Sequence, residues 1–549
     1  MLIKLSSYLS AALLLLGSCS QINHKENLSV YDSILLPQFQ PGAPGAVALV
    51  VKQGKILYSK AFGMANLELA VPMDTGDVFR IGSITKQFTA CAILKLAEEG
   101  KLELSDDISK FIPGYPSHGL HISIENLLTH SSGIKSFTGM KEWTSEVQKQ
   151  KFPPLDFIHW FWNQPLEFKP GSEFRYNNSG FFILGYIIEK VSGKAYATYL
   201  KEEFFTPLGL KDTRYDTSTA IFPHRASGYE LYDGKYRNTD YISMSQPYSA
   251  GALVSTARDL YKWTEALENG KVISKESLLR ARTSYILTNG KSSNYGYGWF
   301  LLNVKGIPTA EHGGGINGFT TYCLYIPGRD VFVALLSNCG SGKVADLSVK
   351  LAAAAMNNPY MEKVTQLPYD SLLKYQGVFR SDSDEAIFRI KDSCVCGWLN
   401  GSKRLIFVPS GSDRLFVRES FTSVQFSRNA KNEIDSVVSS DRANIKHWVK
   451  TNKALPEEKL VKLPQSVLMQ YIGVYKLSPD FTISIQLKDN KLLAEGSGQE
   501  AFQIVARSSV IFQNEDGDIQ FEFCKNTSGK VSKLKLYQNE RVMIAERIN

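Results

Sequence analysis

An internal repeat in the last third of this 549-residue chain constrains its fold more than any other feature. The stretch from Leu367-Pro to Tyr375-Gln-Gly-Val-Phe379 recurs as Leu463-Pro to Tyr471-Ile-Gly-Val-Tyr475, and the two copies are offset by 96 residues (463 − 367). Short alternating strands and turns fill both copies, and helical periodicity largely disappears after residue 359. The pattern indicates two copies of one small unit. Each copy is long enough for an antiparallel barrel of about eight strands.

The repeat also divides the rest of the chain. We expect a signal peptide over residues 1–18, a tether over 19–29, a main domain over 30–357, and two β-barrel modules over 360–458 and 459–549. The hydrophobic share of 43% and the charged share of 21% are typical of a globular protein. A length of this size predicts several domains rather than one.

The first residues resemble a bacterial lipoprotein signal. Lys4 precedes the apolar run 11–16, and the small residues Gly17 and Ser18 precede Cys19. The run is too short to span a bilayer as a mature helix, so removal is expected. Leu16-Gly-Ser-Cys19 resembles the lipobox, which implies a lipid on Cys19 and an exported protein anchored to a membrane on its periplasmic or cell-surface side. The alternative is an ordinary secretory signal that is cleaved without lipidation.

Charge and cysteine spacing argue against two classes of partner. The formal net charge of +8 is modest for this length, and no run of five or six basic residues occurs, so nucleic acid is not an expected partner. Six cysteines remain beyond Cys19, and none has metal-ligand spacing; we expect structural burial for them. They are Cys91, Cys323, Cys339, Cys394, Cys396 and Cys524.

A Ser-x-x-Lys motif, Ser83 and Lys86, opens an apolar stretch that predicts a mostly buried helix over residues 83–99. The i, i+3 spacing puts both side chains on one face, so the amine can reach the hydroxyl. A serine nucleophile needs a base, and burial beside a helix N-terminus lowers the pKa of a lysine. Free N–H groups there would also help to hold an oxyanion. The alternative is a helix-capping serine followed by a surface lysine.

A tyrosine and an asparagine stand two residues apart further along the chain. Residues 170–180 are rich in turn formers and lead into an apolar helix. The phenol of Tyr176 can relay protons to a leaving group, and Asn178 can bond both the lysine and a substrate amide. His130, in a predicted loop, has no acid beside it in sequence, and we interpret it as a structural residue.

A histidine and three glycines precede two predicted strands, 320–326 and 331–336. Bare backbone at this point would let a substrate lie close to the chain as on an edge strand, and the N–H of Gly315 could pair with that of Ser83 as an oxyanion hole. The alternative is a flexible loop. The four residues are His312, Gly313, Gly314 and Gly315.

These three motifs, in this order, resemble the serine β-lactamase and penicillin-binding-protein family. The likeness is closest to its class C-like branch of β-lactamases, D,D-carboxypeptidases, D-aminopeptidases and esterases, and it covers about residues 30–357. The segments 79–89, 127–133 and 207–213 also resemble sequences of that branch. The resemblance implies an α/β sandwich, an antiparallel sheet flanked by helices, together with an all-helical region. The C-terminal repeats look like the lipocalin-like barrels that are appended to members of this family.

The resemblance also implies a role for each motif. Ser83 would be the acylated nucleophile, Lys86 and Tyr176 would share proton transfer, and Asn178 would position them. The strand of His312 would complete the site for a small-molecule or short-peptide acyl substrate, and neither a metal nor an organic cofactor is required. Many true β-lactamases carry Lys-Thr-Gly where this chain has His312-Gly-Gly. A partly neutral histidine weakens the fixed cation for a β-lactam carboxylate, which favours ester or D-amino-acid amide hydrolysis.

Several alternatives stay open at this point. The acyl group could pass to an alcohol acceptor, which would make the protein an acyltransferase. The chain could also be a penicillin-binding sensor lipoprotein that acylates once, or not at all, without turnover. The barrels could bind ligands, although filled barrels that act as spacers are the preferred interpretation. The oligomeric state is not predicted.

Overall fold

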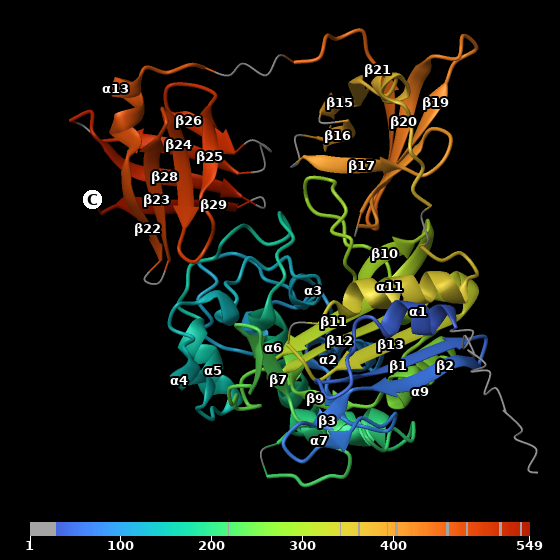
Figure 1. The fold of residues 1–549 in the computed structure, drawn as a ribbon. Coiled ribbons are helices and arrows are strands. Elements are labelled where there is room, and N and C mark those ends of the chain that lie inside the picture. Colours follow the sequence, from blue (N-terminus) through green and yellow to red (C-terminus); the bar gives the residue numbers. More distant parts are fainter. Residues whose placement is uncertain are drawn as a thin grey trace, which may run out of the picture.

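The structure, a computed structural model, describes residues 29–548 except for gaps at 218, 341, 361–362, 392, 401–403, 419, 457–460, 479–480, 515–518, 527 and 539–540. The predicted signal peptide, Cys19 and almost all of the tether lie outside the described residues. Within the described part of the chain, no helix is both long and apolar enough to cross a membrane. Figure 1 shows a main domain and two separate barrels.

A six-stranded antiparallel sheet forms the centre of the main domain, in the order β10-β11-β12-β13-β1-β2. The first and last parts of the domain meet here, because β1 pairs with β13 along its whole length. Both strands are almost entirely buried, as expected of strands that are covered on both faces. The six strands are β1 (Ala46–Lys52), β2 (Lys55–Phe62), β10 (Phe300–Val304), β11 (Ile307–Ile316), β12 (Phe319–Ile326) and β13 (Val331–Ser337).

Two apolar cores lie on the two faces of this sheet. Side chains alternate along β1, so that Val47 and Leu49 join the core beneath the helical region while Ala48 and Val50 join the core beneath α11. Figure 1 shows α1 and α11 on one face of the sheet and α2 on the other. Helices α1 (Val30–Leu35) and α11 (Val344–Ala355) pack together on one face, α9 (Ala257–Glu268) packs against β1 and β13 on the other, and α10 (Lys275–Ala281) follows α9 in the chain.

The helical region is built around α2 (Thr85–Glu98), which follows the short 3₁₀ turn η1 (Gly82–Ile84). Almost every residue of α2 is buried, and Phe88 stacks on Trp263 with ring centroids 4.1 Å apart. The predicted helix over 83–99 is therefore present, but its first residues form the tighter 3₁₀ turn η1. The other helices here are α3 (Ile124–Leu128), α4 (Ser145–Gln148), α5 (Pro154–Phe161), α6 (Asn178–Ser192), α7 (Tyr196–Leu200) and α8 (Tyr248–Gly251).

Seven short strands complete the main domain. β5, β9 and β6 form one small sheet, and β3–β4 and β7–β8 form two pairs. Ile81 N donates to Leu253 O at 3.0 Å, so the three-stranded sheet helps to place the start of η1. The seven are β3 (Met64–Asn66), β4 (Val71–Pro72), β5 (Phe79–Arg80), β6 (Arg214–Tyr215), β7 (Tyr229–Tyr232), β8 (Lys235–Asn238) and β9 (Leu253–Ser255).

The two repeats form two closed eight-stranded antiparallel barrels, which confirms the predicted fold class. A short helix precedes each barrel at the equivalent place, α12 (Tyr369–Leu373) and α13 (Gln465–Leu468). The first barrel contains β14 (Gly377–Ser381), β15 (Asp384–Lys391), β16 (Cys394–Leu399), β17 (Leu405–Pro409), β18 (Arg414–Val417), β19 (Ser423–Arg428), β20 (Ile434–Ser440) and β21 (Ile445–Lys450). The second contains β22 (Gly473–Ser478), β23 (Phe481–Lys488), β24 (Lys491–Gly496), β25 (Phe502–Ala506), β26 (Ile511–Asn514), β27 (Gln520–Lys525), β28 (Val531–Gln538) and β29 (Arg541–Arg547).

Aromatic rings pack inside both barrels. In the first, the ring of Phe426 lies 5.1 Å from that of Phe388 and 4.9 Å from that of Tyr375. In the second, the rings of Tyr471 and Phe523 are 4.6 Å apart. This packing agrees with the interpretation of the barrels as filled modules. The exact segment boundaries in the sequence analysis stay a prediction.

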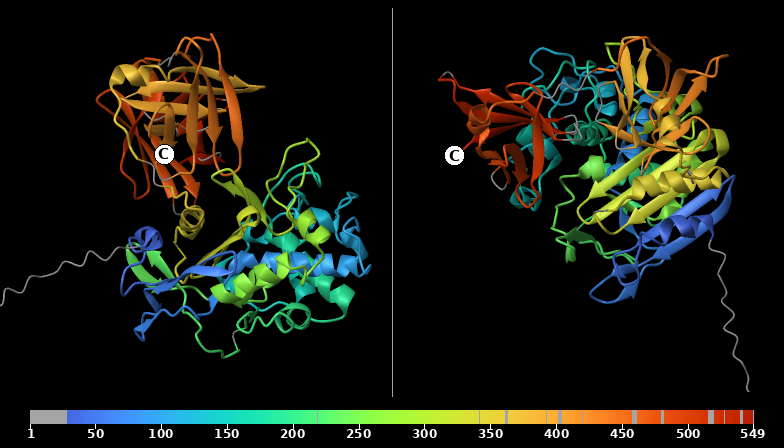
Figure 2. Two further views of the ribbon diagram at one scale, coloured as in Figure 1. Left: turned by 90° about the vertical axis from the view of Figure 1, so that its right-hand side faces the viewer. Right: turned by 45° about the horizontal axis from the view of Figure 1, so that its top comes forward.

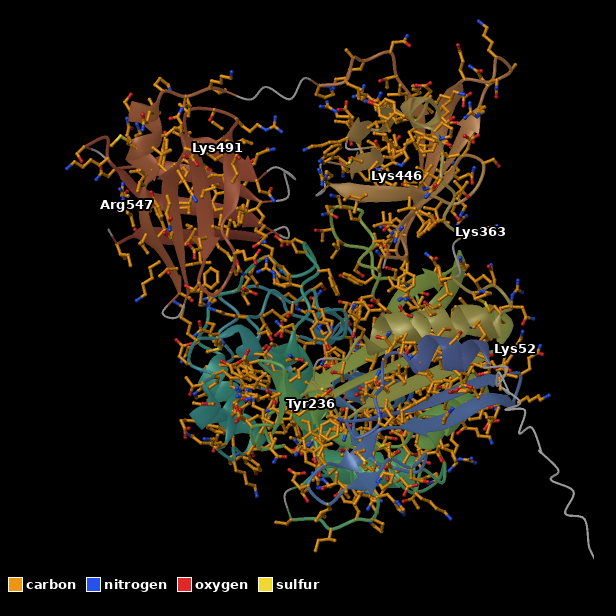
Figure 3. All side chains as sticks on the ribbon, viewed as in Figure 1. Lys52, Tyr236, Lys363, Lys446, Lys491 and Arg547 are labelled. Atoms are coloured by element: carbon orange, nitrogen blue, oxygen red, sulfur yellow. The ribbon has the colours of Figure 1, made fainter. Side chains whose placement is uncertain are left out.

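The first barrel lies against the β10 side of the main domain, as the two views of Figure 2 show. Figure 3 labels Lys363, where the chain passes from the main domain to this barrel, and Lys446 on its strand β21. One expectation about the cysteines is wrong. Cys91, Cys323 and Cys396 are buried, but Cys339 and Cys524 are partly exposed, and Cys394 is exposed because it begins β16, at the end of the strand.

Candidate active site

Ser83 and Lys86 meet at the junction between η1 and α2. Ser83 lies in η1 and Lys86 in the first turn of α2, and Lys86 Nζ is 3.1 Å from Ser83 Oγ. The side chain of Lys86 is fully buried, with 0% of its surface exposed. The alternative of a surface lysine is therefore excluded, and the amine and the hydroxyl are in hydrogen-bonding distance.

The surroundings of the Lys86 amine contain neutral oxygens and aromatic rings. Nζ donates to Asn178 Oδ1 at 2.8 Å and to the carbonyl oxygen of Ala250 at 2.9 Å. It also lies 4.8 Å from the ring centroid of Tyr176 and 5.4 Å from that of Phe181. Burial holds the pKa of Lys86 well below its usual 10.5. This lysine is therefore suited to act as a neutral base.

Asn178 begins helix α6, and its amide is held in one orientation. Its backbone N–H donates to Ser136 Oγ at 3.1 Å, and its Nδ2 donates to Thr138 Oγ1 at 3.2 Å. Since the amide nitrogen is occupied in this way, the oxygen faces Lys86. The preceding residue, Asn177, caps the helix by accepting from Gly180 N at 2.8 Å. Helix capping thus places the asparagine that contacts the lysine.

Tyr176 lies over the same amine, directly before the helix. Its hydroxyl is buried and, among the described residues, makes no hydrogen bond of ordinary geometry. Burial raises the pKa of this phenol, and the nearby Ser83 hydroxyl opposes part of the rise. The ring stacks on Phe300 with centroids 6.2 Å apart. Tyr176 therefore stays protonated near Ser83, with a hydroxyl that is free to bond a substrate.

His312 lies in strand β11, so the alternative of a flexible loop is wrong. Its Nδ1 is 2.6 Å from the carbonyl oxygen of Gly313, and its Nε2 is 3.0 Å from the hydroxyl of Tyr295. A carbonyl only accepts, so Nδ1 carries the hydrogen and Nε2 accepts from Tyr295. Burial, with a smaller contribution from Lys86, lowers the pKa of His312 to about 3. The histidine is therefore neutral, with both ring nitrogens occupied.

The glycines after His312 bring strand β11 against η1. Strand β10 pairs with β11 only as far as Glu311, so residues 312–316 have one free edge, as the sequence analysis expects. A Cβ atom on Gly82 would lie 2.9 Å from Gly315 N, and one on Gly314 would lie 2.0 Å from Ile81 O. A Cβ atom on Gly315 would meet nothing within 4 Å. Because Gly82 and Gly314 have no side chains, the Gly315 amide can lie beside the segment that carries Ser83.

His130 packs against the rings of Tyr176 and Tyr295, which agrees with its interpretation as a structural residue. Asn177 N donates to its Nδ1 at 3.0 Å, so Nε2 carries the hydrogen. Its ring centroid lies 4.4 Å from that of Tyr176 and 4.7 Å from that of Tyr295. Burial lowers its pKa well below the usual 6.5. The ring is a neutral support for Tyr176.

Sequence reasoning missed several neighbours of the site. Tyr295 contacts His312, Phe300 contacts Tyr176, and the carbonyl of Ala250 contacts Lys86. None of these three residues belongs to a recognisable sequence motif. Only their positions in the folded chain reveal them. In the described ranges, no group of three or more His, Cys, Asp or Glu side chains could hold a metal ion.

Comparisons with known proteins agree with this fold. Residues 33–355 match the family described as Beta-lactamase. The chain belongs to this family of β-lactamase and penicillin-binding-protein-like serine hydrolases.

Individual relatives extend this assignment. Penicillin-binding protein 4* of Bacillus subtilis (strain 168) is 30% identical over 409 residues, which cover 69% of this chain and 89% of that protein. Among solved structures, an octameric penicillin-binding protein homologue from Pyrococcus abyssi has a TM-score of 0.53 at 24% identity, covering 92% of this chain and 96% of that chain. A D-stereospecific amidohydrolase from a Streptomyces species has a TM-score of 0.53 at 24% identity, covering 59% and 98%. The two solved structures show the shared fold.

Proposed function

We propose that this protein is an acyl hydrolase that forms an acyl-enzyme on Ser83 from an ester or D-amino-acid amide without a free carboxylate. The single observation that carries the proposal is the buried Lys86 amine, 3.1 Å from the Ser83 hydroxyl and surrounded by neutral partners. A lysine whose pKa is lowered in this way can accept a proton from a serine at neutral pH.

The proton transfers follow from this geometry. Lys86 accepts the proton of Ser83 as Oγ bonds to the substrate carbonyl carbon, and the N–H groups of Ser83 and Gly315 hold the resulting oxyanion. When the bond to the leaving group breaks, Tyr176 donates its proton to the leaving oxygen or nitrogen and recovers one from Lys86. Water then attacks the acyl carbon by the reverse transfers, which releases the acid and restores Ser83.

The state of His312 supports a substrate without a free carboxylate. A neutral imidazole whose two nitrogens already bond Gly313 and Tyr295 offers no fixed cation. A carboxylate brought into this buried site would lose its hydration without an ionic partner. The proposal therefore favours esters and amides over penicillins and peptides with a free terminal carboxylate. The Streptomyces amidohydrolase of the same fold makes D-amino-acid amides a reasonable first choice.

Intact-protein mass spectrometry tests the proposal. The chain without residues 1–19 and its Ser83→Ala variant are each mixed with a p-nitrophenyl ester, a D-phenylalanine amide or a penicillin, and free products are followed over time. We expect an acyl adduct on the wild type alone and steady release of product from the ester or the amide. A stable penicillin adduct without product would favour the sensor alternative, and a new ester formed from added butanol would favour the acyltransferase. An adduct on both proteins would exclude Ser83 as the nucleophile.

We also propose that Cys19 is lipidated and anchors the exported protein to a membrane on its periplasmic or cell-surface side. The apolar run 11–16 and the lipobox-like Leu16-Gly-Ser-Cys19 support this. Cells expressing the full chain would be fed an alkyne-labelled fatty acid, with Cys19→Ser as the matched control. Label on the wild type alone is expected. Export without label on either protein would favour an ordinary secretory signal.

A further inference from the structure

A buried ion pair connects the first barrel to the strand that carries His312. Glu311 directly precedes His312 and is 0% exposed, and Arg442 lies in the turn between β20 and β21. Arg442 Nη2 donates to both carboxylate oxygens of Glu311, at 2.7 Å each. Burial raises the pKa of Glu311, and Arg442 counteracts that rise. Without the arginine, Glu311 would be a buried carboxyl group without its cation.

Glu311 and His312 face opposite sides of the sheet. Glu311 pairs with Leu324, which belongs to the core beneath α11, whereas His312 pairs with Cys323, which belongs to the core beneath the helical region. The barrel therefore holds β11 from one face, and the candidate site uses the other face one residue later.

The turn that carries Arg442 also covers the outer edge of the sheet. Asn303 of β10 donates from its backbone N–H to the carbonyl of Arg442 at 2.8 Å, and from Nδ2 to the same carbonyl at 2.7 Å. Arg442 Nε donates in return to Asn303 O at 3.1 Å. Asp441 Oδ1 accepts from the backbone N–H groups of Ala443 and Asn444, at 2.7 Å each, so the turn is braced internally.

The part of β11 beyond this anchor is paired along one edge only, with β12. Glu311 is the last residue of β11 that pairs with β10, and the next four are His312 and three glycines. Glycines have no side chains to pack, so a glycine-rich strand is weakly held. The position of the Gly315 amide beside η1 consequently depends on what fixes the strand just before it.

We propose that Arg442, a residue of the first barrel, is a positioning residue for the active site of the main domain. Through Glu311 and Asn303 it holds β11 so that the Gly315 amide keeps its place beside Ser83. The first barrel is in this respect part of the catalytic scaffold. This inference rests on the proposed function of Ser83.

Steady-state kinetics on full chains test the role of Arg442. Arg442→Ala and Arg442→Lys are compared with Arg428→Ala, a matched control that breaks a similar two-bond ion pair with Asp413 inside the same barrel, where both distances are 2.7 Å. With the p-nitrophenyl ester we expect Arg442→Ala to lower kcat by about tenfold to a hundredfold, because small displacements of catalytic groups have effects of this size. Arg442→Lys should recover part of the loss, whereas Arg428→Ala should stay within about twofold of the wild type.

Two measurements separate positioning from misfolding. The burst of p-nitrophenol counts the active sites, and we expect the same count in Arg442→Ala as in the wild type, with KM changed far less than kcat. A loss of sites that accounts for the loss of kcat would overturn the proposal, as would equal kcat values for Arg442→Ala and Arg428→Ala.

Hydrogen exchange measured by mass spectrometry does not depend on the reaction. Peptides that cover residues 307–316 should exchange faster in Arg442→Ala than in either the wild type or Arg428→Ala. Unchanged exchange would overturn the anchoring by Arg442 whatever the activity shows. Faster exchange in a protein whose Ser83 never acylates would support the anchoring and overturn the proposed function alone.

Discussion

Burial decides what the Ser-x-x-Lys motif can do. The same four residues at the end of an exposed helix would present a capping hydroxyl and a hydrated ammonium group. Here Lys86 is fully buried, and its nitrogen bonds the neutral oxygens of Asn178 and Ala250. No charge in those contacts offsets the cost of burying a cation, so the lysine pKa falls.

The pH profile of kcat/KM should reflect the free amine of Lys86. Activity requires the deprotonated form, so kcat/KM should rise with pH and reach its plateau well before pH 10.5, the usual lysine value. The measurement is ester hydrolysis across the pH range with the wild type and His312→Gln. The same rising limb in both would assign it to Lys86. A limb that disappears in His312→Gln would assign it to the histidine instead.

Stability should fall in acid because His312 is buried in its neutral form. Its pKa is about 3 in the folded state and 6.5 in the unfolded chain, so the unfolded chain binds more protons between these values. The free energy of unfolding should therefore rise as the pH increases from 3 to 6.5, with His130 acting in the same direction. Urea denaturation at several pH values measures this slope. His312→Gln should make it shallower, and an unchanged slope would contradict the low pKa.

A cation at position 312 should change the substrate preference. His312→Lys places an amine in the wall of the site, and this amine can take up a proton and pair with a penicillin carboxylate when the substrate brings that negative charge into the site. A hydrogen bond between charged groups is worth about 1.5–3 kcal/mol, so we expect penicillin acylation to accelerate about tenfold or more. The rate of adduct formation measures this, with His312→Gln as the neutral control. Equal rates in the two variants would count against the missing cation as the reason for poor penicillin recognition.

At the scale of elements, the contact between β11 and η1 organises the site. Both partners expose backbone at the contact, because Gly82 and Gly314 have no side chains there, and Thr321 Oγ1 donates to Ile81 O at 3.0 Å beside them. The glycine-rich stretch forms part of a strand because β12 pairs with it as far as Ile316. Side chains in these positions would separate the two elements.

Gly314→Ala should disrupt this contact. Its Cβ atom would lie 2.0 Å from the carbonyl oxygen of Ile81. The clash is with a backbone atom, so no side-chain rotation can relieve it. Overpacking of this kind costs about 1–3 kcal/mol of unfolding free energy, and we expect kcat to fall as well. Gly328→Ala is the control, because a Cβ atom there meets nothing within 4 Å. Unfolding midpoints in urea and ester kinetics measure both effects; matching values for the two variants would argue against the close approach.

At the scale of the whole molecule, the first barrel is connected to the central sheet of the main domain by specific polar contacts. The Arg442 pair with Glu311 and the bonds to Asn303 join the first barrel to the main domain, a contact that the internal repeat does not predict. Aromatic rings pack inside the barrel, and the contacts with the main domain come from the turn between β20 and β21.

The interior of the first barrel should behave as an ordinary apolar core. Phe426 is 2% exposed and packs between Phe388 and Tyr375. Phe426→Ala should lower the free energy of unfolding of this barrel by about 3–5 kcal/mol. Urea denaturation followed by circular dichroism measures the change, with Val449→Ala, at a position 65% exposed on the same barrel, as the control. A loss below about 1 kcal/mol would indicate an interior that is not tightly packed.

The sequence by itself determined the parts of this protein whose signal is local. Ser83 with Lys86, Tyr176 with Asn178, and His312 with its glycines are short motifs. The barrels follow from a repeat and from strand periodicity. Hydrophobic periodicity and motif spacing act over a few residues, so a linear chain displays them directly.

Only the tertiary structure decided the state of the groups in the site. The burial of Lys86, the occupied nitrogens of His312 and the Arg442–Glu311 pair each depend on residues far apart in the chain. The ion pair spans 131 positions, and the bond from Lys86 to the carbonyl of Ala250 spans 164. The free energies of charged and polar groups depend on their solvation and on their partners, which no local pattern encodes. The motifs therefore identify the groups of the candidate site, and the fold gives those groups their protonation states and positions.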